Sequence, residues 1–251
     1  MSSILIVLSA ADTWIRSDGS EYATGFWAEE LIVPLRRFLD GGHTVAFATP
    51  GGQAPTLDPH SVDPAIVGDA AGMLRAEVDA IADRLEHPMA LADVVVTDYD
   101  AVFVPGGHAP MVDLYKDRDM GRILSEAVDA EKVVGAVCHG PAALLSATRD
   151  DGTWLFAGRH LAVVTDDEER AFGTAENAPW LLASRLRETG AVVEGGQNWE
   201  SFVVQDGRLV TGQNPASAGQ VADSMLTEAR AAAGRTARHS HDGPIRWAAE
   251  T

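Results

Sequence analysis

The single cysteine of the 251-residue chain, Cys138, stands where a nucleophile is expected. Residues 133–137 before it are small or β-branched apolar residues, a pattern typical of a strand buried on both faces of a parallel sheet. Gly140 and Pro141 follow and open an apolar helical run, which predicts a tight turn from strand to helix. Such a turn is a nucleophile elbow, which lifts a reactive side chain above the carboxyl edge of a sheet.

A free cysteine is more often a small buried hydrophobic residue, so the reactive interpretation needs support. The Gly-Pro exit into a helix and the adjacent His139 provide it, because a core cysteine needs neither. The amides and the partial positive charge of the helix start are expected to favour thiolate and to lower the pKa of Cys138. We therefore predict that Cys138 is the nucleophile.

A thiol nucleophile needs a base, a group that orients the base, and donors for a developing oxyanion. His139 can supply the imidazole if the turn is sharp, and Glu169, in preference to Glu168, can fix its tautomer. The backbone amides of Gly107 and His139 are candidates for the oxyanion donors. Glu30, held against a thiolate in an apolar pocket, would have its pKa raised, could donate a hydrogen bond to sulfur, and could later act as general base.

These residues also have simpler interpretations. Glu168 and Glu169 belong to an acidic cluster at a helix start, where carboxylates suit the dipole. Gly106 and Gly107, before His108, can form an ordinary turn, and Glu30 can lie on a solvated helix face. No metal is predicted, because the remaining histidines considered lack metal-ligand spacing. They are His60, His87, His239 and His241.

The composition excludes several classes of partner. Acidic residues outnumber basic ones by 37 to 19, and the formal net charge of −18 repels nucleic acid and anionic lipid. A single cysteine excludes an intrachain disulfide and suits a reducing compartment. Residues 1–8 are predicted to form a first strand rather than a signal peptide, and no apolar run is long enough to cross a bilayer. We expect a cytoplasmic protein that binds neither nucleic acid nor membrane.

Strands and helices alternate along the chain, which predicts an α/β fold with a doubly wound, mostly parallel sheet. The Asp206-Gly207 dipeptide predicts a late hairpin. Pro34 is expected to kink the first helix or to mark its true start. The strands are predicted at residues 4–8, 43–49, 101–104, 133–137 and 161–164, and the helices at 31–39, 120–130, 180–187 and 214–232.

Residues 51–91 differ in composition from their surroundings. Four prolines flank a helical stretch at 70–86, and we interpret the segment as an insertion that packs over the sheet edge as a cap or lid. The expected organisation is a single domain over residues 1–233 with this insertion, followed by a polar tail over 234–251.

Four stretches of the chain resemble the DJ-1/PfpI superfamily, and within it the Hsp31-like branch of glyoxalase III and chaperone proteins. They occur in the family's order, at residues 24–31, 98–108, 136–141 and 206–217. The resemblance spans residues 4–232. It implies a flavodoxin-like fold, like that of class I glutamine amidotransferases, a homodimer, a small aldehyde substrate and no cofactor.

The resemblance also implies roles for individual residues. It makes Cys138 the nucleophile, His139 its triad neighbour, and Glu30 the acid that hydrogen-bonds the cysteine. The third triad member falls on Glu169, with Glu168 as the alternative.

Gly106, Gly107 and His108 are expected to bind substrate or its oxyanion. The family often has glycine where Ala109 stands, so an extra methyl group is expected at the pocket wall.

The implied function is that of a glutathione-independent glyoxalase, which converts methylglyoxal or a related 2-oxoaldehyde to a 2-hydroxy acid in carbonyl detoxification. One alternative is a cysteine hydrolase or amidase of the PfpI type. The glutamine amidotransferase version is disfavoured, because no His-x-Glu triplet follows the cysteine. Another alternative is a holdase chaperone or stress protein whose cysteine senses oxidation, a role that a low-pKa exposed thiolate would suit.

Overall fold

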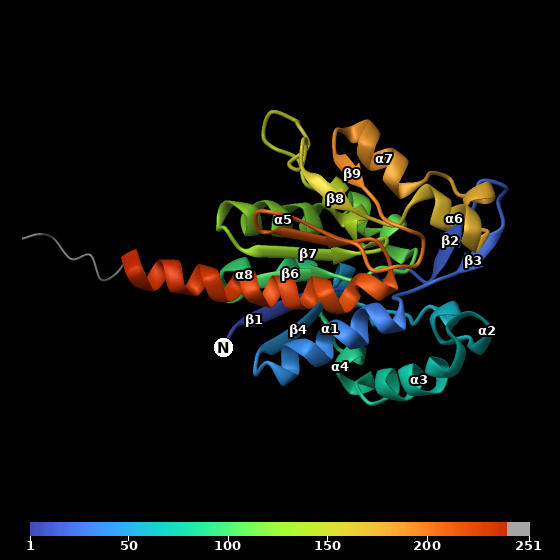
Figure 1. Ribbon diagram of the computed structural model, residues 1–251, viewed down its shortest axis with the longest axis horizontal. Coiled ribbons are helices and arrows are strands. Elements are labelled where there is room, and N and C mark those ends of the chain that lie inside the picture. Colours follow the sequence, from blue (N-terminus) through green and yellow to red (C-terminus); the bar gives the residue numbers. More distant parts are fainter. Residues whose placement is uncertain (240–251) are drawn as a thin grey trace, which may run out of the picture.

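The structure, a computed structural model, describes residues 1–239 (Figure 1). Its centre is a seven-stranded sheet in the order β10-β11-β7-β6-β1-β4-β5, in which every neighbouring pair is parallel except the β10–β11 hairpin. This confirms the predicted mostly parallel sheet and the hairpin. The strands are β1 (Ser3–Val7), β4 (Thr44–Thr49), β5 (Met89–Ala90), β6 (Ala101–Val104), β7 (Val133–Val137), β10 (Val203–Asp206) and β11 (Leu209–Gly212).

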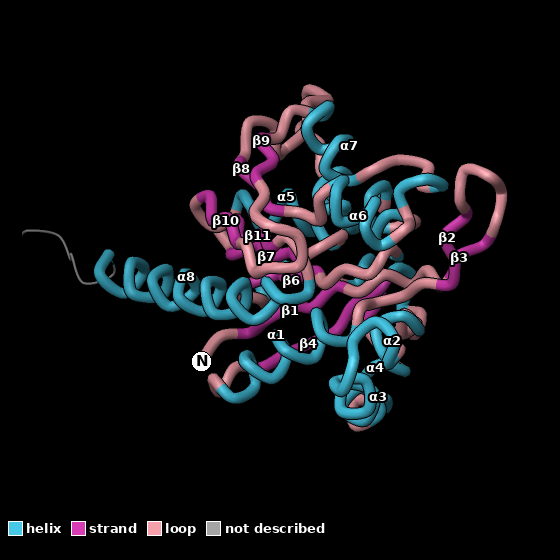
Figure 2. The backbone as a smooth tube through the Cα atoms, turned by 45° about the vertical axis from the view of Figure 1, so that its right-hand side comes forward, coloured by secondary structure: helices cyan, strands magenta, loops and turns pink. Residues whose placement is uncertain are grey.

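Helices cover both faces of the sheet, as a doubly wound fold requires. α1 (Ala28–Asp40) and α8 (Ala218–His239) pack together on one face, and α5 (Arg118–Asp129) lies on the other (Figures 1 and 2). Every residue of β6 and β7 is buried between them, which explains the unbroken apolar runs of these strands. Pro34 lies inside α1 and does not mark its start.

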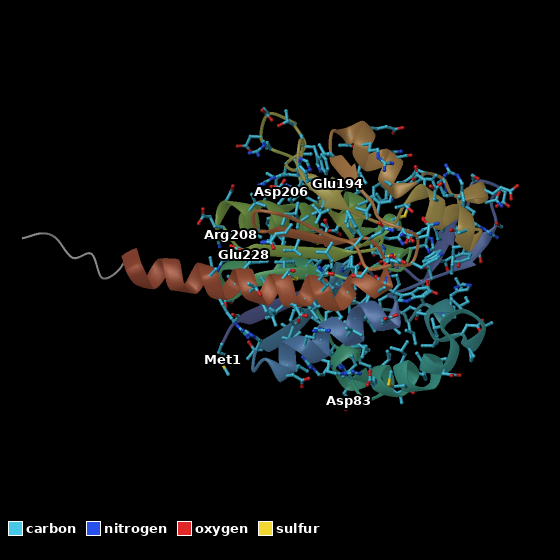
Figure 3. The ribbon with its side chains drawn as sticks, viewed as in Figure 1. Met1, Asp83, Glu194, Asp206, Arg208 and Glu228 are labelled. Carbon is cyan, nitrogen blue, oxygen red and sulfur yellow. The ribbon has the colours of Figure 1, made fainter. Side chains whose placement is uncertain are left out.

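The predicted strand at 161–164 is not part of the central sheet. β8 (His160–Ala162) pairs with β9 (Val192–Glu194) in a separate two-stranded sheet. Its backbone amides are taken by side chains of the hairpin: His160 N donates to Asp206 Oδ2 at 3.0 Å, and Ala162 N donates to Thr211 Oγ1 at 2.9 Å. Figure 3 shows Asp206 and Glu194, the two carboxylates that bond His160. Side-chain acceptors of the hairpin thus take the place of the backbone hydrogen bonds that would join β8 to the central sheet.

The segment 51–91 contains α2 (Pro64–Val67), α3 (Ala71–Asp79) and α4 (Ala82–Glu86) and ends with the edge strand β5, so the predicted helix at 70–86 is divided. α3 packs against α1, and Arg84 donates a hydrogen bond of 2.8 Å to the Val45 carbonyl of β4. The segment therefore lies beside the outer strands and below α1 in Figure 1.

Further elements complete the chain. Among the described residues, no helix is long and apolar enough to cross a membrane. α8 continues to His239, beyond its predicted end near residue 232, and includes the start of the predicted tail. The rest of that tail, with His241, lies outside the described residues. The remaining strands and α-helices are β2 (Thr13–Ile15), β3 (Glu21–Ala23), α6 (Asp166–Phe172) and α7 (Leu182–Thr189).

Candidate active site

Cys138 occupies the sharp turn that the sequence predicts. Its φ of 60° is left-handed, a conformation that costs a non-glycine residue about 1–2 kcal/mol. The surrounding backbone fixes it, since Cys138 N donates to Gly212 O at 2.9 Å and Val164 N donates to Cys138 O at 3.1 Å. A Cβ on Gly140 would overlap the Val104 carbonyl, so only glycine fits there. The segment that follows is a 3₁₀ helix (Gly140–Ser146), not the predicted α-helix.

The turn brings the neighbouring imidazole back onto the sulfur. His139 Nδ1 lies 3.3 Å from Cys138 Sγ, and His139 Nε2 lies 2.6 Å from Glu169 Oε1. Cys138, His139 and Glu169 thus form a continuous hydrogen-bonded series at the end of β7. This is the order of groups that activates a nucleophile through an oriented base.

The helix cap of α6 separates the roles of two adjacent glutamates. Thr165 caps the helix, and Glu168 completes the capping box. Glu168 Oε1 also accepts from Trp199 N at 2.9 Å and from Asn214 Nδ2 at 2.8 Å. Glu169 points instead toward His139, because successive helical residues face directions about 100° apart. The structure therefore brings Glu169, and not Glu168, to the imidazole.

Glu169 is surrounded by donors. His108 Nε2 lies 3.3 Å from its Oε2, and the Thr174 hydroxyl donates to the same oxygen. Burial alone would raise the pKa of Glu169, but His139 and His108 hold that pKa well below its usual range. Glu169 is therefore ionised and accepts hydrogen bonds from both imidazoles. His108 is itself fixed by stacking on Trp14, with ring centroids 4.7 Å apart.

The protonation state of His139 follows from this arrangement. Burial, and next the neighbouring His108, lower the pKa of His139. The neutral ring donates its Nε2 proton to the ionised Glu169, which leaves Nδ1 as a bare acceptor facing Cys138. His139 is thus set up to take the proton of the thiol.

Glu30 reaches the site from the first turn of α1 and is fully buried. Gly106 N donates to Glu30 Oε2 at 2.6 Å, whereas Oε1 is buried without a hydrogen-bond partner among the described residues. The Glu30 carboxyl also interacts with the thiol of Cys138, and burial raises the pKa of Glu30 well above its usual value. A Cβ on Gly106 would stand 2.7 Å from Glu30 Oε2, so glycine permits this approach. The Gly106 amide therefore donates its hydrogen bond to Glu30 and is not free to bind substrate.

The expected low pKa of Cys138 is wrong for this site. Burial raises the pKa of the thiol well above its usual value, and a charge on Glu30 raises it further. A protonated Glu30 removes the second contribution but not the first. The resting sulfur is therefore a thiol, and His139 Nδ1, 3.3 Å away, is an acceptor within reach of its proton.

The thiol opens onto a cavity of about 520 Å³. Cys138 is 8% exposed and lines it together with Gly107 and His108. Ala109 is fully buried and does not line it among the described residues, so the expected methyl group at the wall is absent. Five residues of the 51–91 segment also line the cavity: Ile66, Val67, Ala70, Met73 and Leu74.

Several contributors were missed from the sequence. Thr174 reaches Glu169 only because Gly173 ends α6 with a φ of 85°, and that glycine was the one available signal. Phe172 and Trp199, which line the cavity, carried no sequence signal of their own.

His108, His139 and Glu169 also have the composition of a metal-binding group, and their ligand atoms lie within 4.8 Å of one another. The same atoms are already paired, each imidazole with one Glu169 oxygen. A cation held there would compete for the carboxylate that orients His139.

Comparison with known proteins identifies the fold and its family. The family model described as ThiJ/PfpI family-like matches residues 22–165, more than half of the chain. The chain belongs to the ThiJ/PfpI family. The predicted likeness to the DJ-1/PfpI superfamily and its Hsp31-like branch is confirmed.

This ThiJ/PfpI protein is similar along most of its length to three proteins of known name. The protein/nucleic acid deglycase HchA of Staphylococcus aureus is 26% identical over 239 residues, covering 89% of this chain and 79% of its own. Glyoxalase III from Candida albicans is 28% identical with a TM-score of 0.78, covering 90% of this chain and 97% of that one. The Francisella tularensis Rapid Encystment Protein is 25% identical with a TM-score of 0.82, covering 91% and 99%.

Proposed function

We propose that this protein is a glutathione-independent glyoxalase, which converts 2-oxoaldehydes to 2-hydroxy acids through a cysteine hemithioacetal. The observation that supports it is that two different proton-transfer groups lie beside the Cys138 turn. One is His139, whose Nδ1 is 3.3 Å from Cys138 Sγ, and the other is the fully buried Glu30, whose carboxyl accepts from the Gly106 amide against the backbone of His139. A hydrolytic triad needs only the imidazole and its carboxylate. A second, protonated carboxyl suits a reaction that moves a proton between two carbons of the substrate.

In the first step, His139 Nδ1 takes the thiol proton of Cys138 while the sulfur bonds to the aldehyde carbon. The aldehyde oxygen takes up a proton from Glu30, whose raised pKa keeps it protonated until that moment. The product is a hemithioacetal, and Glu30 is left as a carboxylate able to act as base.

In the second step, the Glu30 carboxylate takes the proton on the former aldehyde carbon while the imidazolium of His139 protonates the ketone oxygen, which gives an enediol. Glu30 then returns its proton to the adjacent carbon while the hydroxyl on the sulfur-bearing carbon gives its proton to His139, and the product is a thioester of the 2-hydroxy acid. Water cleaves the thioester: its hydroxyl adds to the acyl carbon, Glu30 takes its proton, and the His139 imidazolium protonates the departing sulfur. The aldehyde and one water account for every atom of the acid, so no electron acceptor is needed.

The test is conversion of methylglyoxal to lactate by the purified protein without glutathione. We expect turnover by the wild type and its loss in Cys138→Ser, with the melting temperature of both proteins recorded to confirm folding. Unchanged turnover in Cys138→Ser, or none by the wild type across several small aldehydes, would contradict the proposal. Hydrolysis of amides without lactate formation would favour the hydrolase instead.

A further inference from the structure

The cavity beside Cys138 is far larger than a three-carbon aldehyde requires. Its volume of about 520 Å³ falls within the range of roughly 300–1,000 Å³ found for sites that hold drug-sized ligands. The reacting groups lie along one part of it, at Cys138, His139 and Glu169. The remaining space must be explained by another part of the ligand.

The rest of the wall is apolar and comes from both sides of the opening. Ile66 and Met73 project from the α2–α3 region, and Phe172 and Trp199 stand among the other lining residues. The Phe172 and Trp199 ring centroids lie 6.3 Å apart, a spacing at which aromatic rings pair.

Three large apolar side chains of this wall are exposed to solvent. Ile66, Met73 and Trp199 are 41%, 54% and 47% exposed and lie together around one cavity. An apolar ligand would cover them.

The charge of the cavity restricts the ligand further. Among the described lining residues there is no lysine or arginine, whereas Glu29, Glu168 and Glu169 are present. Glu169 is ionised, as argued above, and the whole chain carries a net charge of −18. A carboxylate or phosphate on the substrate would find no counter-charge and would be repelled.

We propose that the substrates of this site are uncharged 2-oxoaldehydes whose keto carbon carries a large apolar group, an aryl ring or a long alkyl chain. This rests on the proposed glyoxalase function. The aldehyde carbon bonds to Cys138 and the apolar group lies between the α2–α3 region and Phe172. The atoms balance as before, with one aldehyde and one water giving one 2-hydroxy acid.

The first experiment compares kcat/KM for phenylglyoxal and methylglyoxal. We expect phenylglyoxal to be preferred by at least about tenfold, because its ring buries apolar area on the cavity wall. Since the two aldehydes also differ in intrinsic reactivity, the decisive quantity is the change of this ratio in Met73→Ala. It should fall several-fold, whereas Met89→Ala, an exposed methionine on β5 outside the cavity, should leave it unchanged.

The second experiment measures binding without turnover, by calorimetry with acetophenone, acetone and benzoate. Acetophenone should bind at least about tenfold more tightly than acetone, and benzoate, with the same ring and a negative charge, should bind more weakly than acetophenone.

The outcomes separate the two proposals. Absence of turnover with either aldehyde overturns the glyoxalase function, whatever the calorimetry shows. Turnover with a ratio near one, an equal change in Met73→Ala and Met89→Ala, or acetophenone binding no better than acetone overturns the substrate class and leaves the function standing.

Discussion

Two buried glutamates flank the reactive pair, and their surroundings are opposite. Glu169 receives hydrogen bonds from His139, His108 and the Thr174 hydroxyl. Glu30 receives one, from the Gly106 amide, and its other oxygen has no hydrogen-bond partner among the described residues. Both side chains are almost completely excluded from water, so burial alone cannot distinguish them.

The number and charge of the donors decide the protonation states. The pKa of Glu30 is raised by burial with little to offset it, whereas the imidazoles around Glu169 overcome burial and lower its pKa. One carboxyl is therefore a fixed anion that orients His139, and the other is an acid that can move a proton. The same residue type thus supports two roles, set by its neighbours.

Replacing each glutamate by glutamine tests most directly whether Glu30 and Glu169 have different roles, and it should have the largest effect. Glu30→Gln cannot carry a proton, whereas His139 can still pass the thiol proton to the aldehyde oxygen, so kcat for methylglyoxal should fall by about 10²–10⁴-fold while the covalent hemithioacetal accumulates. Glu169→Gln leaves His139 without its anionic partner, so thiol activation fails and adduct formation itself should be slow. Rapid-quench mass spectrometry of the intact protein measures the adduct.

Glu176→Gln, at an exposed position, is the matched control and should behave as the wild type. Equal adduct levels in Glu30→Gln and Glu169→Gln would mean that the two carboxyls do not divide the chemistry as argued.

The pH dependence of stability sharpens the comparison. The folded-state pKa of Glu30 lies above its ordinary value of 4.5, so its stabilising contribution is complete below pH 4.5 and is lost as pH rises through the folded pKa. Relative to wild type, Glu30→Gln should therefore gain about 1.4 kcal/mol of unfolding free energy per pH unit over the window that begins near 4.5.

Glu169 has the opposite sign. Its folded pKa is depressed, so its contribution is present above its ordinary value of 4.5 and is lost as pH falls below it. Glu169→Gln should be less stable than wild type at neutral pH, and the deficit should shrink on acidification. Urea unfolding between pH 3 and 8 measures both trends, and parallel trends for the two variants would refute the assignment.

Local sequence patterns were enough to predict the elbow and most of the sheet. The apolar run before Cys138 and the Gly140-Pro141 exit encode that turn within a few residues. The exclusion of β8 from the sheet was not predictable, because it depends on Asp206 and Thr211, which are distant in sequence and take its amides.

The site was predicted less evenly. Counting from Thr165 and the family resemblance selected Glu169, and the resemblance placed Glu30 near the sulfur. The prediction of a lowered pKa for Cys138 was wrong. This pKa depends on burial by the whole surrounding fold, whereas the prediction considered only the local turn. The apolar cavity wall combines residues of the α2–α3 region with Phe172, which are distant in sequence, so no local pattern predicts it.

The smallest expected effect tests whether donor number matters on the Glu169 side. Thr174 is buried, and Thr174→Val keeps its shape while removing the hydroxyl that donates to Glu169 Oε2. Two imidazole donors remain, so the carboxylate should stay ionised, and loss of one hydrogen bond should lower kcat/KM by about 2–10-fold.

Thr174→Ser restores the hydroxyl and should recover most of that loss, which separates positioning of Glu169 from simple packing. Steady-state kinetics with both variants, each checked by its melting temperature, provides the measurement. If valine has no effect while glutamine at Glu169 does, the charge on Glu169 matters and the number of its donors does not. If serine fails to rescue, the methyl group of Thr174 rather than its hydroxyl supports the site, and the contrast between a donor-rich and a donor-poor carboxyl rests on the imidazoles alone.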